Sequence, residues 1–144
     1  MKRILIATAI AATVAFTAAA PAMAGGFWVK QYGFGNAVGG KQTGWNNSYS
    51  IQQTGRYNSQ VGQQWGNNNV GAVGQEGRNN SADTWQRGNN NAAGVAQFGN
   101  NHRSMITQDG NGNIVAGVQV GNNCSANVTQ AGSGNVSAFV QSCN

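Results

Sequence analysis

Residues 64–86 read QWGNNNVGAVGQEGRNNSADTWQ and hold two copies of one pattern between the glutamines Gln64, Gln75 and Gln86. Glycine follows each glutamine after two residues, and in both copies asparagine follows after five. Outward from this stretch, glutamine keeps the same phase from residue 31 to residue 141 without an insertion or deletion. Self-similarity at a fixed period is the signature of a repeat architecture. The unit Q-x-G-x-x-N-x-x-x-x-x therefore predicts a solenoid of short, similar units.

Three columns of residues define the period. The glutamine column contains Gln31, Gln42, Gln53, Gln64, Gln75, Gln86, Gln97, Gln108, Gln119, Gln130 and Gln141. The glycine column contains Gly33, Gly44, Gly55, Gly66, Gly77, Gly88, Gly99, Gly110, Gly121 and Gly132, and Cys143 takes the next place. The asparagine column contains Asn36, Asn47, Asn58, Asn69, Asn80, Asn91, Asn113 and Asn135, with His102 and Cys124 at the remaining places.

The composition is far from that of an ordinary enzyme. The 144 residues include 22 Gly, 21 Asn and 14 Gln, and only 8% of them are charged, against about 25% in a typical soluble domain. Such a composition is also typical of low-complexity disorder. Disorder does not require glutamine to keep its place over 120 residues, so the strict phase favours a folded repeat.

Residues 1–24 have the pattern of a secretory signal peptide. Met1-Lys2-Arg3 is a short positive segment, residues 4–20 are apolar, and Ala22-Met23-Ala24 is a small-residue cleavage site. A membrane anchor is the alternative, but the apolar run is slightly short for a span. We therefore expect a signal peptide at 1–24 and one repeat domain at 25–144, which has a net charge of +3 and no transmembrane segment.

Each unit reads as one strand and one tight turn. Glycine and asparagine enclose the turn, and the seven residues from asparagine to the next glutamine form the strand, with side chains alternating between its two faces. Glutamine, asparagine and the positions seven and nine residues after glutamine then point inward. Two strands make one 22-residue coil, and we expect adjacent coils to pair in parallel register at about 4.8 Å. The predicted fold is an all-β solenoid of cross-β type, with two strands per coil.

The inward positions predict a thin core in which large residues face small ones. On this geometry Tyr49 lies opposite Gly40 and Gly62, and Phe27 also meets Gly40. Identical residues stack from coil to coil, and each buried amide is expected to bond its neighbours above and below, which satisfies groups that would be costly to bury alone. The glutamine and asparagine columns are therefore the candidate self-assembly ladders, and the glycine column marks the turns.

The departures from the pattern fall near the C-terminus. His102 and Cys124 are expected to stack in the asparagine column headed by Asn36. Cys124 and Cys143 are expected to lie one coil apart and diagonally across a turn. The distance between their Cα atoms is then roughly 7 Å, which is at the limit for a disulfide. Free thiols and a bridge between subunits are the alternatives. Two or three such ligands without a motif do not predict a metal site, and we expect no cofactor.

The repeat Q-x-G-x-x-N-x-x-x-x-x-Q in a secreted chain that lacks proline after Pro21 resembles the curlin repeat of bacterial curli subunits. The resemblance covers residues 31–141. Nearly every half-repeat here carries both glycine and asparagine, which resembles the minor, nucleating subunit more than the major one, and the choice between the two subunits stays open. The resemblance implies export through a dedicated outer-membrane pore, assembly with itself and with another curli subunit into extracellular amyloid fibres at the cell surface, and roles in biofilm matrix and adhesion.

Three classes of function remain to be weighed. A structural fibre subunit is favoured because the repeats run close to both ends without a polar cap, and uncapped coils expose unpaired backbone groups. A soluble solenoid that binds ice or carbohydrate needs a face of repeated residues, whereas the outward column from Lys41 to Thr129 is mixed. Catalysis is not expected, because there is one histidine, no nucleophile motif and no phosphate loop. No specific nucleic-acid binding is expected either.

Overall fold

We analysed a computed structural model of the chain, which describes residues 25–144; the expected signal peptide at 1–24 lies outside the described residues. Eleven strands follow one another along the chain: β1 Phe27–Phe34, β2 Ala37–Thr43, β3 Ser48–Arg56, β4 Ser59–Trp65, β5 Val70–Arg78, β6 Ser81–Arg87, β7 Ala92–Asn100, β8 Arg103–Asn111, β9 Ile114–Asn122, β10 Ser125–Ser133 and β11 Val136–Cys143.

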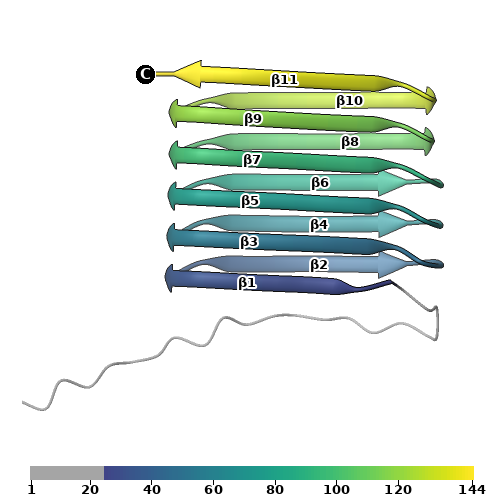
Figure 1. The fold of residues 1–144 in the computed structure, drawn as a ribbon, viewed down its shortest axis with the longest axis horizontal. Coiled ribbons are helices and arrows are strands. Elements are labelled where there is room, and N and C mark those ends of the chain that lie inside the picture. The colour runs from purple at the N-terminus through teal and green to yellow at the C-terminus, as the bar shows by residue number, and fades with distance from the viewer. Residues whose placement is uncertain (1–24) are drawn as a thin grey trace, which may run out of the picture.

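The strands alternate between two parallel sheets. The odd strands form a six-stranded sheet in the order β1-β3-β5-β7-β9-β11, and the even strands form a five-stranded sheet from β2 to β10. Figure 1 shows the stack, in which the odd strands run one way and the even strands run back behind them. Each strand pairs with the strand one coil away at a shift of 22 residues, as in Gln53↔Gln75 and Gly55↔Gly77. The predicted solenoid of two strands per coil is confirmed.

The strand limits differ slightly from the expected ones. Strands begin one residue after the asparagine and continue past the glutamine, so that β3 and β5 include the glycines Gly55 and Gly77. The backbone therefore still pairs with the next coil where the glycine bends it. This continued pairing keeps identical residues stacked through the turn.

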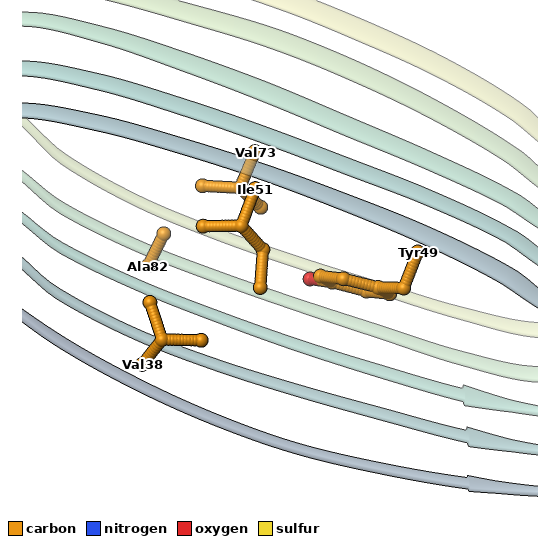
Figure 2. Packing of buried hydrophobic residues seen from close by; sticks show 5 residues of the cluster. All are labelled: Val38, Tyr49, Ile51, Val73 and Ala82. Atoms are coloured by element: carbon orange, nitrogen blue, oxygen red, sulfur yellow. The ribbon is translucent and has the colours of Figure 1, made fainter. Parts of the chain in front are cut away.

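The core is thin and lies between the two sheets. Figure 2 shows one apolar cluster at the N-terminal end, formed by Val38, Tyr49, Ile51, Val73 and Ala82. A second cluster at the other end contains Ala93, Val95, Ile106 and Val115. These residues occupy the positions seven and nine after glutamine, as the alternation predicts. Within residues 25–144, no helix is long and apolar enough to cross a membrane.

The aromatic residues of the core form two of the expected pairs and one contact that was not expected. Side chains added at Gly40 and Gly62 would meet the Phe27 and Tyr49 rings respectively, as predicted, and the Tyr49 ring also lies against Gly71. Gly71 is the register partner of Tyr49 one coil away. The ring therefore leans along the solenoid axis toward the following coils, where two glycines leave room for it.

Candidate self-assembly ladders

The glutamine column forms two continuous chains of side-chain hydrogen bonds, one in each sheet. In each chain the Nε2 of one glutamine donates to the Oε1 of the glutamine 22 residues further on, at 2.7–3.0 Å. Gln53, Gln64, Gln86, Gln97, Gln108 and Gln119 are fully buried. All nine bonds run in the same direction, from the N-terminal toward the C-terminal end of the stack.

The same glutamines also connect the two sheets. From Gln53 onward, each Nε2 makes a second hydrogen bond to a backbone carbonyl 16 residues earlier, at 2.9–3.1 Å. For Gln86 this acceptor is Val70, on a strand of the opposite sheet. Each amide thus satisfies both of its protons inside the core, and unsatisfied buried amides would be costly.

The asparagine column forms a ladder of another kind. The Oδ1 of Asn47 accepts from the backbone N–H of Asn69 at 3.0 Å, and its Nδ2 donates to the carbonyl of Gly66 at 2.8 Å. The other interior asparagines repeat these bonds. The sequence predicts that these amides bond one another, but the asparagine side chain is one methylene shorter than that of glutamine. Its head group stays at the turn and therefore pairs with the backbone of the next coil.

The glycine column brings successive turns into direct contact. All ten of these glycines have a positive φ, between 98° and 129°. At Gly77, for example, an added Cβ would overlap the carbonyl oxygen of Gly99. Both the backbone angle and the absence of space therefore require glycine at this place in the turn.

A second left-handed position, which the sequence analysis did not single out, lies four residues after each glutamine. The residue there has a φ between 53° and 70° in all ten turns. Asparagine or glycine, the residues that tolerate this conformation best, occupies nine of these places, and Tyr57 occupies the tenth. This column was visible in the sequence as the residue just before each asparagine.

His102 replaces asparagine without interrupting the ladder. Its backbone N–H donates to Asn80 Oδ1 at 3.0 Å, and its Nδ1 accepts from the backbone N–H of Cys124 at 3.2 Å. Its Nε2 lies 3.1 Å from the carbonyl of Phe98, four residues back, where an asparagine Nδ2 would donate. With the proton on Nε2, the ring donates to the carbonyl four residues back and accepts from the amide of the next coil, as an asparagine does. The further bond of Asn47 Nδ2 to Gly66, 19 residues on, has no counterpart among the hydrogen bonds of His102 within residues 25–144. His102 and Cys124 therefore stack in the expected column.

We predict that His102→Asn preserves this ladder and that His102→Leu breaks it. Leucine supplies no acceptor for the buried Cys124 amide, and an unsatisfied buried group costs about 1–3 kcal/mol. The expected result is at least roughly tenfold faster hydrogen exchange at the Cys124 amide in His102→Leu. Unchanged exchange in His102→Leu, or equally fast exchange in His102→Asn, would contradict this role of the ring.

The sulfur atoms of Cys124 and Cys143 lie within bonding distance of each other, with 5.6 Å between the Cα atoms of the two residues. Cys124 occupies the asparagine column and Cys143 pairs in register with Gly121. We propose that an intramolecular disulfide joins the two cysteines in the exported protein. Thiol labelling of the denatured, unreduced protein of residues 25–144 should then label no cysteine, and labelling of both cysteines would rule the bond out.

Tyr49 forms a buried polar cluster that the sequence analysis also missed. Its hydroxyl hydrogen-bonds to Thr84 Oγ1 and accepts from Gln60 Nε2 at 2.6 Å. Burial raises the pKa of the Tyr49 phenol well above its ordinary value. The three residues come from β3, β4 and β6, so the cluster links the two sheets. It has no access to solvent and is structural.

Charged side chains of neighbouring coils also stack on one another. Arg87 and Asp109 stack as register partners, and so do the like-charged Arg56 and Arg78. Across residues 25–144, no group of three or more His, Cys, Asp or Glu side chains is placed to hold a metal ion.

A comparison with protein-family models finds the curlin associated repeat twice, at residues 77–110 and 105–132. Comparisons with curated proteins and with solved structures found no match. The matched residues run from β5 to β10, and the same period, register and ladders continue on both sides of them from Gln31 to Gln141. Residues 77–132 therefore match the curlin associated repeat, and the unbroken period extends the same repeat from Gln31 to Gln141.

Proposed function

We propose that this chain is a structural subunit of extracellular curli-type amyloid fibres and that it assembles end to end through its glutamine and asparagine ladders. Residues 1–24 direct its export, and a dedicated outer-membrane pore carries it to the cell surface. There it joins copies of itself and another curli subunit in a fibre that contributes to the biofilm matrix and to surface adhesion. Export, partners and these roles are those that the match to the curlin associated repeat suggests.

The observation that carries the proposal is the pair of open ends. Among residues 25–144, strands β1 and β2 at one end and β10 and β11 at the other pair with a strand on one side only. Such edges present rows of unpaired backbone groups, and soluble proteins usually blunt or cover them. Here the edges carry two charged residues, Lys30 and Lys41, at one end and no charged side chain at the other.

The ladders make the ends complementary as well as open. Within residues 25–144, the Oε1 of Gln31 accepts no hydrogen bond, and the Nε2 of Gln141 donates one instead of two. One end therefore offers acceptors and the other offers donors. Identical stacked amides that bond from layer to layer are a feature of stable cross-β assemblies.

The test is the assembly of purified protein of residues 25–144. We expect it to form fibres that bind thioflavin, to elongate faster when preformed fibres are added, and to give a meridional reflection near ~4.8 Å. A protein that stays monomeric at all concentrations, or an aggregate without that reflection, would contradict the proposed function.

A further inference from the structure

The two ends of the solenoid are offset by half a coil. Eleven strands at two per coil make five and a half coils, so the six-stranded sheet has one strand more than the five-stranded sheet. Both β1 and β11, the first and last strands, belong to the same sheet. Figure 1 shows these two strands at opposite ends of the stack, both running in the same direction.

This inference rests on the proposed function. We propose that successive copies of the chain in the fibre are rotated by about half a turn around the fibre axis. In this arrangement β1 of one copy pairs with β10 of the preceding copy, and β2 pairs with β11. Each sheet of the fibre then alternates between the six-stranded and the five-stranded sheet of successive copies.

Backbone pairing favours the rotation. Stacking without rotation would place β1 of the new copy on β11, and its β2 would lie two strand spacings, about 9.6 Å, from β10. A whole row of N–H and C=O groups would then face a gap on one side of every junction. Half a turn brings both new strands to the ordinary spacing, and the alternation of sheets continues across the junction unbroken.

The side-chain ladders continue in the same arrangement. At shifts of 22 residues, Gln31 of the new copy falls on Gln130 and Gln42 falls on Gln141. The Nε2 atoms of Gln130 and Gln141 each have one donor proton that is not used within residues 25–144. These protons point along the ladder in the direction in which each earlier glutamine donates. Without rotation, Gln130 would have no glutamine above it.

The asparagine column gives an independent match. Asn135 is the last asparagine of its stack, and its Oδ1 accepts no hydrogen bond from residues 25–144. The half-turn places Asn36 of the new copy in the next position, where its backbone N–H meets this Oδ1 as Asn135 meets Asn113. Without rotation, Gly25 would take that position and Asn36 would fall above the missing strand.

The core side chains at the junction keep the packing that they have in the single copy. The Phe139 ring lies against Gly117, one coil below it, and the Phe27 ring lies against Gly40 on the strand that follows. The two rings therefore lean away from the junction, in opposite directions. In the rotated arrangement Phe27 of the new copy stacks on Ala126, a small residue.

The rotation also sets the axial repeat of the fibre. Five and a half coils advance the fibre by about 26 Å per copy, and two copies restore the starting orientation after about 53 Å. Stacking without rotation would instead repeat with every copy, after about 29 Å. Fibre diffraction or helical image analysis can distinguish these two spacings.

Cysteine cross-linking tests which strands meet. Lys30, Thr129 and Val140 all point outward and are exposed. In the rotated fibre Lys30 stacks on Thr129 at about 4.8 Å, within reach of a disulfide, whereas Val140 lies on the opposite face. Lys30→Cys protein is co-assembled in equal amounts with Thr129→Cys protein or with Val140→Cys protein. The fibres are then oxidised and dissolved without reductant, and the covalent dimer is measured on a gel.

We expect dimer from the mixture with Thr129→Cys and only background from the mixture with Val140→Cys. Each variant assembled alone controls for exchange with the proposed disulfide between Cys124 and Cys143. Trp28→Cys with Asn127→Cys or Ala138→Cys repeats the comparison at a second position. Dimer chiefly with Val140→Cys or Ala138→Cys would overturn the rotation while leaving the fibre function intact, and fibres with dimer in neither mixture would overturn the head-to-tail junction. Failure of the unsubstituted protein to form fibres would overturn the proposed function itself.

Discussion

Gly77→Ala should abolish assembly of the protein of residues 25–144. Gly77 has a φ of 124°, and its added Cβ would overlap the carbonyl oxygen of Gly99 in the next coil. Backbone held in this region by a residue other than glycine costs about 1–3 kcal/mol, and overpacking adds a similar amount. The turn cannot move aside without losing its pairing with the coils above and below. We expect no seeded fibre growth on the time scale of the unsubstituted protein.

Gly74→Ala is the matched control, since Gly74 lies on the same strand, β5. Nothing lies within 4 Å of a Cβ added there, and its register partner one coil away is already Ala96. Replacing glycine by alanine at a compatible position usually stabilises a protein by about 0.4–1 kcal/mol. Gly74→Ala should therefore assemble as well as the unsubstituted protein or better. Comparable growth rates for the two variants would contradict the close contact of the glycine turns.

Gln53→Ala should raise the concentration of protein that stays soluble beside its fibres. Gln53 is fully buried, accepts from Gln31 at 2.7 Å and donates to Gln75 at 2.8 Å. Alanine leaves the half-buried Nε2 of Gln31 without its acceptor and the buried Oε1 of Gln75 without its donor, and an unsatisfied buried group costs about 1–3 kcal/mol. A total of at least ~2 kcal/mol corresponds to a roughly 30-fold rise in soluble protein at equilibrium.

Gln52→Ala is the control for this change, because Gln52 is the adjacent residue on β3 and points to solvent. It removes the same side chain from the outer face, where water satisfies the amide. We expect its soluble concentration to stay within about twofold of the unsubstituted value, since surface substitutions usually change stability by less than ~0.5 kcal/mol. If the soluble concentration rose equally for Gln52→Ala and Gln53→Ala, the assignment of Gln53 to the buried ladder and of Gln52 to the outer face would be wrong.

Much of the fold could be predicted from the period alone. An unbroken spacing between Gln31 and Gln141 leaves one register for parallel coils, and alternation along each strand then decides which side chains are buried. Residues such as Asn47, Tyr49, Ile51 and Gln53 are accordingly inside. No long loop or insertion competes with this solution, so local pattern and global fold agree.

The atomic partners of the side chains could not be predicted in the same way. The period places Asn47 and Gln53 in equivalent stacks, but the length of each side chain decides whether its amide reaches the backbone of the turn or the next amide. The direction of the Tyr49 ring depends on the space that Gly62 and Gly71 leave together. A prediction that considers one facing pair of residues at a time does not include both glycines. These choices follow from three-dimensional packing over several coils, beyond the reach of one repeat.

The common direction of the glutamine bonds has an electrical consequence. Each side-chain amide carries a dipole, and in both glutamine columns the N–H ends point toward β11 and the C=O ends toward β1. Backbone dipoles of parallel strands largely cancel along this axis, whereas aligned amides add, as they do in a helix. A fibre of such copies would carry partial positive charge at its β11 tip and partial negative charge at its β1 tip. Growth at the two tips should therefore respond oppositely to charged surfaces, within the Debye length of about 10 Å at 0.1 M salt.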